Sequence, residues 1–243
     1  MSFLKNLRLQ FSGDLYEIYL INFSVEAAEL RGLLPDPIKA RVHDGRVMIS
    51  MVDVRLLNMR AKSILIPFKF HYQHIGFRVL VEDAQWNPEK SNKGIYFLRS
   101  FTDNPTMTWA GNLFANYRLE NAKLTNYPSG LRIENADQFL EYRLTGPVFE
   151  PDHKSKQLKE TIGAIDRAWA VENHELQKTQ IMREKWPLQA MNCLRFETNF
   201  FETARFEGAF RVTEMIHYTW LPAETVAVLT PQTAPLALAM PYA

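Results

Sequence analysis

Histidine and cysteine, the residues most often found in reactive or metal sites, are few in this sequence and are poorly spaced for such a site. His71 and His74 form the one close histidine pair, and a spacing of three residues on a strand places them on opposite faces. Cys193 is the single cysteine, which excludes an intrachain disulfide and a thiolate cluster. The common nucleotide, zinc-protease and hydrolase motifs are absent. We therefore expect no metal and no cofactor, and we expect Cys193 to be a small buried apolar residue.

Charged and aromatic side chains remain as candidates for contacts with a small molecule. His71 and Arg99 each lie in a segment with strand character, where alternate residues face opposite sides. Trp109 and Trp186 are large apolar groups that are suited to the walls of a pocket. Each of the four also has a simpler interpretation, in which the strand residues face solvent and the tryptophans pack in the core.

Most of the chain shows the alternation of apolar residues that is typical of short β-strands. The segments with this character are residues 15–23, 46–56, 68–81, 95–101, 123–125, 130–134, 138–144, 169–171, 176–183, 190–197 and 211–220. Turn sequences at 43–45 and 92–94 precede two of them. Many short strands of this kind favour a closed or sandwiched antiparallel sheet and a mainly β (α+β) fold.

Three short helices are predicted between the strands. Ser24 is a suitable N-cap for a helix over 25–34, and Asn104 is suited to the same position before a helix over 106–116. The third predicted helix, over 155–167, is amphipathic. Residues 230–243 contain three prolines and no apolar period, so we expect a flexible tail after a single domain at 1–229.

Composition and charge narrow the class of protein. The 243 residues are 47% hydrophobic and 23% charged, values typical of a globular chain that can bury a core. The net charge is +1 and no run of like charges occurs, which argues against nucleic acid and membrane partners. No apolar run is long enough to span a membrane, and the first ten residues lack the features of a signal peptide. Together with the single cysteine, these features predict a cytoplasmic protein.

Three segments, taken in order, resemble the acetoacetate decarboxylase-like superfamily and in particular its uncharacterised DUF2071 (YqjF-like) branch. They are LRGLLPDP at 30–37, IYFLRSFTDNPTMTWAGNLFANYRLENAKL at 95–124, and WPLQ at 186–189. Their order and spacing extend the resemblance over about residues 13–228. The resemblance implies one closed antiparallel β-barrel that encloses a pocket, with a few short covering helices and a tendency to form homo-oligomers.

The same resemblance indicates that the decarboxylase chemistry is missing. Those enzymes use a lysine Schiff base whose amine is activated by a neighbouring lysine, and the paired lysines align with Arg118 and Leu119. Arginine stays protonated and cannot form the imine, but its planar fork of donors is suited to a carboxylate. If Arg118 points into the pocket, Asn116 does too. The alternative is a surface Arg118 paired with Glu120 or Glu141.

Three functions remain open from the sequence. The first is a binding protein whose barrel holds a small, mostly apolar anionic molecule, with a carboxylate as one form of the anionic end. The second is an enzyme without a Schiff base, a lyase, isomerase or hydrolase, in which Arg118 polarises a carbonyl compound such as a keto acid and His71 or a glutamate moves the proton. The third is an oligomeric structural module with a vestigial pocket.

Overall fold

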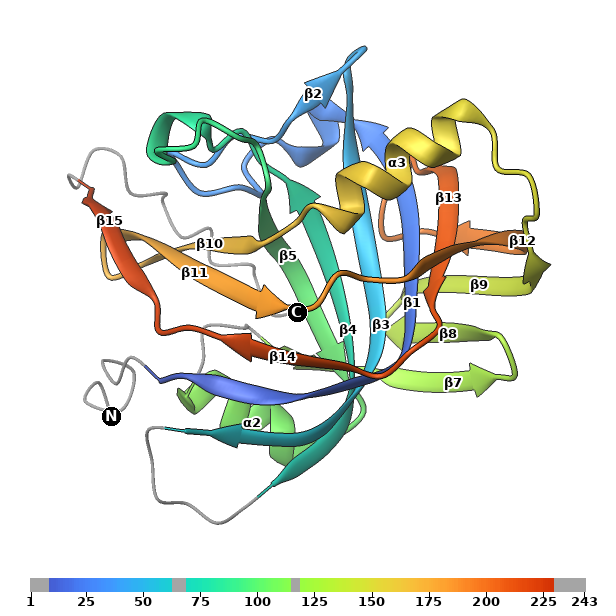
Figure 1. The fold of residues 1–243 in the computed structure, drawn as a ribbon, viewed down its shortest axis with the longest axis horizontal. Coiled ribbons are helices and arrows are strands. Elements are labelled where there is room, and N and C mark those ends of the chain that lie inside the picture. Colours follow the sequence, from blue (N-terminus) through green and yellow to red (C-terminus); the bar gives the residue numbers. More distant parts are fainter. Residues whose placement is uncertain (1–8, 63–68, 115–118, 230–243) are drawn as a thin grey trace.

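The computed structural model describes residues 9–62, 69–114 and 119–229 of the protein, and strands make up most of it (Figure 1). The strands are β1 Phe11–Glu26, β2 Val42–His43, β3 Arg46–Ala61, β4 Phe70–Leu80, β5 Gly94–Thr102, β6 Leu119–Asn121, β7 Lys123–Tyr127, β8 Gly130–Asn135, β9 Gln138–Pro147, β10 Arg167–Glu172, β11 Glu175–Arg183, β12 Leu188–Thr198, β13 Arg205–Val212, β14 Ile216–Trp220 and β15 Glu224–Val228. The helices are η1 Ala27–Leu30, η2 Ala84–Trp86, α2 Pro105–Phe114 and α3 His153–Gly163. The mainly β fold is confirmed.

Seven of the strands close into a barrel. Each is hydrogen-bonded to the next in the order β3, β4, β5, β10, β11, β14 and β1, and β1 pairs with β3 to close the ring. Neighbouring strands run antiparallel except β5 and β10, which run parallel. Because a closed barrel leaves no free edge among its own strands, the backbone donors and acceptors of the wall are largely paired within it.

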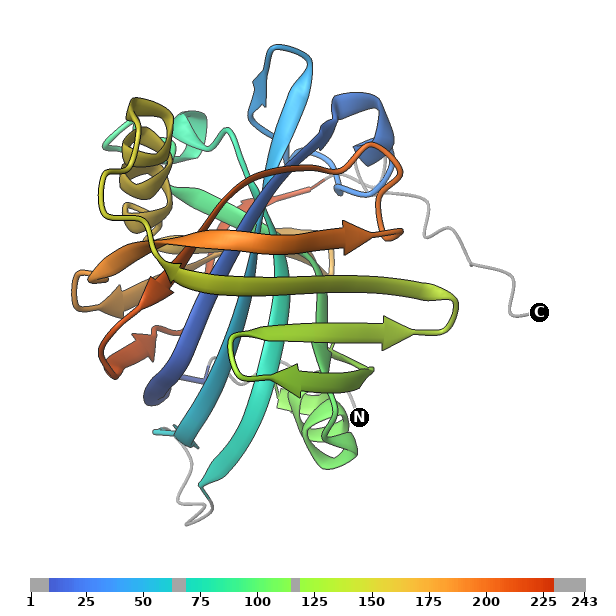
Figure 2. The same ribbon diagram turned by 90° about the vertical axis from the view of Figure 1, so that its right-hand side faces the viewer.

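A second layer of strands covers part of the outside of the barrel. The sheet continues from β1 through β13, β12, β9, β8 and β7, and Figure 2 shows these strands crossing the long strands of the wall. One hydrophobic cluster contains residues of β8 and β9 and lies between the wall and this layer. The other cluster has buried members on six of the seven barrel strands, and the partly buried Ile181 of β11 packs against it, so this cluster fills the interior. Alternation along β1 places Leu20 in the inner cluster and Ile21 in the outer one.

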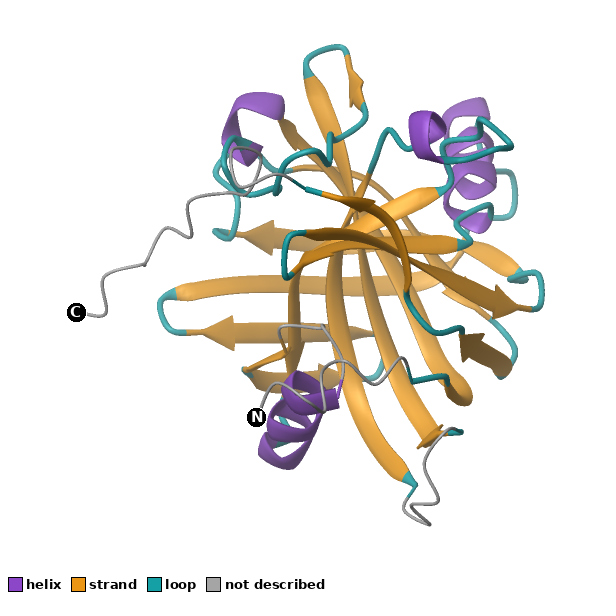
Figure 3. Ribbon diagram, turned by 90° about the vertical axis from the view of Figure 1, so that its left-hand side faces the viewer, coloured by secondary structure: helices purple, strands orange, loops and turns teal. Residues whose placement is uncertain are grey.

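Short helices lie at the two ends of the barrel, with α3 at the upper end and α2 at the lower end in the view of Figure 1, and Figure 3 shows the same separation. Two of the three predicted helices are present. The Asn104 cap is confirmed, since its side-chain oxygen accepts a bond from the backbone N–H of Met107 at 3.2 Å. The third helix begins earlier than predicted, at His153, because Asp152 caps it.

The predicted helix over 25–34 is wrong. Strand β1 continues to Glu26 and is followed only by the short η1, which has no side-chain cap. Ser24 pairs with Arg205 of β13 and with Met48 of β3, and its hydroxyl donates to Glu207 instead of capping a helix. The strand continues through Ser24 because it has hydrogen-bonded partners on both sides, which is a tertiary effect that outweighs the local cap signal.

No helix in the described ranges is long and apolar enough to cross a membrane. The single-domain prediction for 1–229 stays a prediction, and the proposed tail lies outside the described residues.

Candidate functional site

The inner face of the barrel carries a row of polar residues across three neighbouring strands. The register pairs Asn22 of β1 with Ser50 of β3, and Ser50 with Arg78 of β4. The residues two positions away on the same strands belong to the inner hydrophobic cluster, namely Leu20, Val52 and Leu80. Because residues two apart on a strand share a face, all three polar side chains belong to the interior face. All three are buried.

Arg78 is a buried cation that is not paired with any Asp or Glu side chain. Its Nε donates to the carbonyl of Ser50 at 3.0 Å and its Nη2 donates to the Ser50 hydroxyl at 2.9 Å. Every Asp and Glu of the sequence lies in the described ranges, and none of these side chains pairs with Arg78. Burial, reinforced by the charge of Arg183, lowers the pKa of Arg78 to about 9, so the side chain is still protonated at neutral pH. A buried charge of this kind is unfavourable until a counter-charge neutralises it.

Arg183 supplies a second cation at the end of β11. Its guanidinium lies 4.2 Å from the centre of the Trp186 ring and donates to the carbonyl oxygens of Gly163 at 3.2 Å and Ile165 at 2.7 Å. Burial lowers the pKa of Arg183 to about 10. Trp186 is itself buried in the inner cluster, and its indole Nε1 has no hydrogen-bond partner within the described ranges.

His74 lies on the same inner face of β4 as Arg78. Its ring stacks on Phe97 with the ring centres 6.2 Å apart and the planes 18° from parallel, and Phe97 in turn contacts Trp220. Burial, and then the charge of Arg78, lower the pKa of His74 to about 4. The imidazole is therefore neutral at pH 7 and adds no charge to the site.

These groups define what the barrel interior can do chemically. Two arginines offer positive charge and a fork of N–H donors, and the neutral imidazole and the indole add polar atoms within apolar and aromatic walls. Such an interior is suited to an anionic group that is attached to an apolar body. The described residues provide no cluster of ligands for a metal ion.

A second polar cluster lies on the other face of β3, between the barrel wall and the second layer. Asp53 is buried, and its carboxyl accepts a bond from the Tyr142 hydroxyl at 2.6 Å and from the Gln73 amide at 2.7 Å. Gln73 is bonded in turn to the exposed Asn126. Burial raises the pKa of Asp53 to about 6, which the two hydrogen bonds only partly oppose.

The structure does not bring the predicted site residues together in one place. Arg118 and Asn116 lie outside the described residues, so their orientation stays a prediction. His71 is exposed and Arg99 lies on the outer face, bonded to Glu120 at 2.6 Å, so neither faces the barrel interior. The side chain of Trp109 is 67% exposed and forms no buried wall. Among the predicted site residues that the structure describes, only Trp186 belongs to the inner cluster.

The period of the strands explains these differences. His74 and Arg78 are on the inner face of β4, and position 71 falls on the opposite face because it is an odd number of residues away. A register shift between β4 and β5 pairs Arg99 with the outward Phe77. Arg78 could have been noticed in the sequence, since it is a charged residue at an apolar position of an alternating strand.

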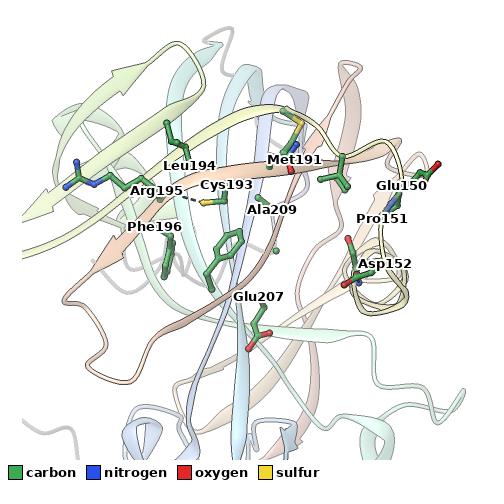
Figure 4. A pocket seen from close by; sticks show the side chains of 16 residues that line it. Glu150, Pro151, Asp152, Met191, Cys193, Leu194, Arg195, Phe196, Glu207 and Ala209 are labelled. Atoms are coloured by element: carbon green, nitrogen blue, oxygen red, sulfur yellow. Dashed lines mark hydrogen bonds between the residues drawn. The ribbon is translucent and has the colours of Figure 1, made fainter.

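A surface pocket of about 610 Å³ lies beside the first turn of α3 and is shown in Figure 4. Its polar lining includes Glu150, Asp152 and Glu207, and its apolar lining includes Cys193 and Phe196. Cys193 is half-buried, and burial raises the pKa of its thiol. Gly208 also lines the pocket, and its carbonyl accepts a bond from the Asn22 amide at 3.2 Å. The pocket therefore adjoins the first residue of the polar row inside the barrel.

Comparison with solved structures identifies the class of protein to which this fold belongs. The fold is that of the acetoacetate decarboxylase-like proteins. MppR, an enduracididine biosynthesis enzyme with HEPES bound, is similar with a TM-score of 0.56 and 8% identity over 91% of this chain and 88% of that one. Acetoacetate decarboxylase from Legionella pneumophila is similar with a TM-score of 0.55 and 12% identity over 89% and 87%. An acetoacetate decarboxylase-like enzyme from Sphingomonas wittichii RW1 has a TM-score of 0.52 and 11% identity over 89% and 92%.

Within this class the chain belongs to the DUF2071 family, which is described as an uncharacterized conserved protein and whose family model matches residues 14–225. No curated protein matches the sequence. At 8–12% identity the structural matches establish the fold alone. The chemistry has to be argued from the residues of this chain.

Proposed function

We propose that this protein binds a small, mostly apolar anion inside its barrel and that Arg78 is the principal anchor for the anionic group. One observation carries the proposal, namely a buried, protonated guanidinium that no Asp or Glu side chain neutralises. Arg183 lies close enough to lower the pKa of Arg78, so an anion between the two arginines would relieve their repulsion. A carboxylate, which an arginine binds with two parallel hydrogen bonds, fits this site best.

We propose further that the protein does not act through a Schiff base. A lysine that forms an imine near neutral pH needs a desolvated or electrostatically activated amine. Apart from Lys5, every lysine lies in the described ranges, and none of those lysines is buried. The alignment of Arg118 with the reactive lysine of the decarboxylases supports the same conclusion. Arg118 stays a predicted second contact for the ligand.

Titration with the anionic dye 8-anilinonaphthalene-1-sulfonate tests the binding proposal, and the neutral N-phenyl-1-naphthylamine is its matched probe. We expect Arg78→Met to weaken the anionic dye by about 2 to 5 kcal/mol, or about 30-fold or more, and to leave the neutral dye nearly unchanged. Arg132→Met, which removes an arginine paired with Glu134 and Glu141, is the control variant. Equal binding of the anionic dye to the wild type and Arg78→Met would contradict the proposal.

An enzyme without a Schiff base is the second candidate, and the Asp53 cluster favours it. A carboxyl whose pKa is about 6, hydrogen-bonded to a phenol, can exchange a proton near neutral pH. The test is exchange of the α-protons of pyruvate in deuterated buffer, followed by NMR with wild type and Asp53→Asn. Exchange at the rate of buffer alone in both proteins would remove this candidate.

We also propose that the protein is a cytoplasmic homo-oligomer. The resemblance to the decarboxylase superfamily supports the oligomer, and a single unpaired cysteine suits a reducing compartment. Light scattering on the purified protein would measure its mass directly, and a mass of 28.3 kDa would contradict the oligomer.

A further inference from the structure

Helix α3 is attached to the rest of the molecule by few contacts. Its sequence is strongly polar, and only Leu158 and Ile162 of its eleven residues are buried. Both side chains belong to the inner hydrophobic cluster, to which α3 is joined through the neighbouring strands β12 and β13. A helix held by two apolar side chains can separate from the barrel without disrupting the strands beneath it.

Polar contacts hold α3 at both ends. Near its first turn, the ammonium of Lys154 pairs with Glu207, whose other carboxylate oxygen accepts a bond from the Ser24 hydroxyl at 2.6 Å. At the last turn, Arg183 donates to the carbonyl of Gly163 and to that of Ile165 just beyond the helix. Arg183 is thus shared between the end of α3 and the cationic site inside the barrel.

The position of the surface pocket indicates which end of α3 would move. The pocket lies beside the Lys154 end of α3, and its lining includes Asp152 and Ser155 of the helix start and Gly208 of β13. Figure 4 shows Asp152 at the start of the helix. Leu158 lies against Gly208, where an added Cβ would be 3.1 Å from its side chain. Leu158 therefore contacts a glycine that lines the pocket and also accepts a bond from Asn22, the first residue of the polar row.

We propose that α3 is the lid of the barrel, that a ligand enters from the surface pocket when the Lys154 end lifts, and that Arg183 couples the closed lid to the bound anion. This inference rests on the proposed function, because it assumes an anion at Arg78. The Arg183 guanidinium packs on Trp186 of the inner cluster, and in the empty protein its charge opposes that of Arg78. An anion between them removes that opposition and stabilises Arg183 where it caps α3, so the ligand favours closure.

Stopped-flow measurement with 8-anilinonaphthalene-1-sulfonate tests the lid. Lys154→Met and Glu207→Gln each remove one side of the ion pair, and we expect both variants to raise the association and dissociation rates several-fold while the Kd changes less than twofold. Lys159→Met, on the same helix, is the matched control because no ion pair involves Lys159 in the described residues. Unchanged association and dissociation rates in both Lys154→Met and Glu207→Gln would overturn the proposal that α3 is a lid.

Hydrogen exchange tests the coupling through Arg183. We expect the dye to slow exchange of the α3 amides in the wild type and to have little effect on them in Arg183→Met. Equal protection in both proteins would overturn the role of Arg183. These outcomes differ from a failure of the proposed function, in which Arg78→Met would bind the dye as tightly as the wild type at equilibrium.

Discussion

Replacement of Arg78 by methionine should make the empty protein more stable, although it removes a buried side chain with two hydrogen bonds. The pKa of Arg78 falls from 12.5 to about 9 on folding. At 1.36 kcal/mol for each pKa unit, this difference corresponds to about 5 kcal/mol of unfavourable energy for the charged form. The two bonds from the charged guanidinium to Ser50 contribute about 1.5 kcal/mol each. Methionine has a similar length and no charge, so we expect a net gain of about 1 to 3 kcal/mol, which raises the Tm by several degrees.

The assay is thermal unfolding of protein refolded from urea, because a ligand carried through purification would stabilise the wild type and hide the effect. Arg167→Met is the matched control. Arg167 is as buried as Arg78, but it pairs with the fully buried Asp83 at 2.6 Å, so its loss should destabilise the protein by about 3 to 5 kcal/mol. If Arg78→Met melts below the wild type without ligand, Arg78 is a structural residue and the reasoning fails.

Three further predictions concern proton binding, covalent chemistry and the tail. The pKa of Asp53 rises from 3.8 to about 6 on folding, so the protonated carboxyl contributes stability that is fully present below about pH 4 and is lost as the pH rises through about 6. In urea titrations, the difference in unfolding free energy between wild type and Asp53→Asn should therefore change by about 3 kcal/mol across this range. A difference that stays constant with pH would refute the prediction. Incubation with acetoacetate and borohydride should leave the intact mass unchanged, and a stoichiometric adduct would show that a lysine forms an imine. Truncation after Leu229 should leave the Tm of the remaining chain unchanged, and a marked fall would show that residues 230–243 belong to the core.

The architecture was predictable because its signals are local and repeated. Alternation along a strand directly reports which side chains face the interior, as Leu20 and Ile21 show. The Asn104 cap was predictable for the same reason, since the bond joins residues three apart. Ser24 has an equally good cap sequence, but its hydrogen-bond partners are far along the chain, and no local pattern shows them.

The candidate site was less predictable because its defining property is an absence. That Arg78 is charged and lies at an apolar position can be read from the sequence. That no Asp or Glu side chain reaches it depends on the place of every acidic residue in the fold. The exposure of His71 and the pairing of Arg99 with Glu120 likewise depend on face and register, and a shift of one residue reverses both.

A crystal structure of the protein grown with an iodinated aromatic carboxylate, 4-iodobenzoate, tests the central claim most directly, because the anomalous signal of iodine locates the ligand without interpretation of its shape. We expect one strong iodine peak inside the barrel, with the carboxylate within hydrogen-bond distance of the Arg78 guanidinium, and no such peak in Arg78→Met. Iodine peaks confined to the outer surface in both crystals would contradict the claim that the barrel binds an apolar anion.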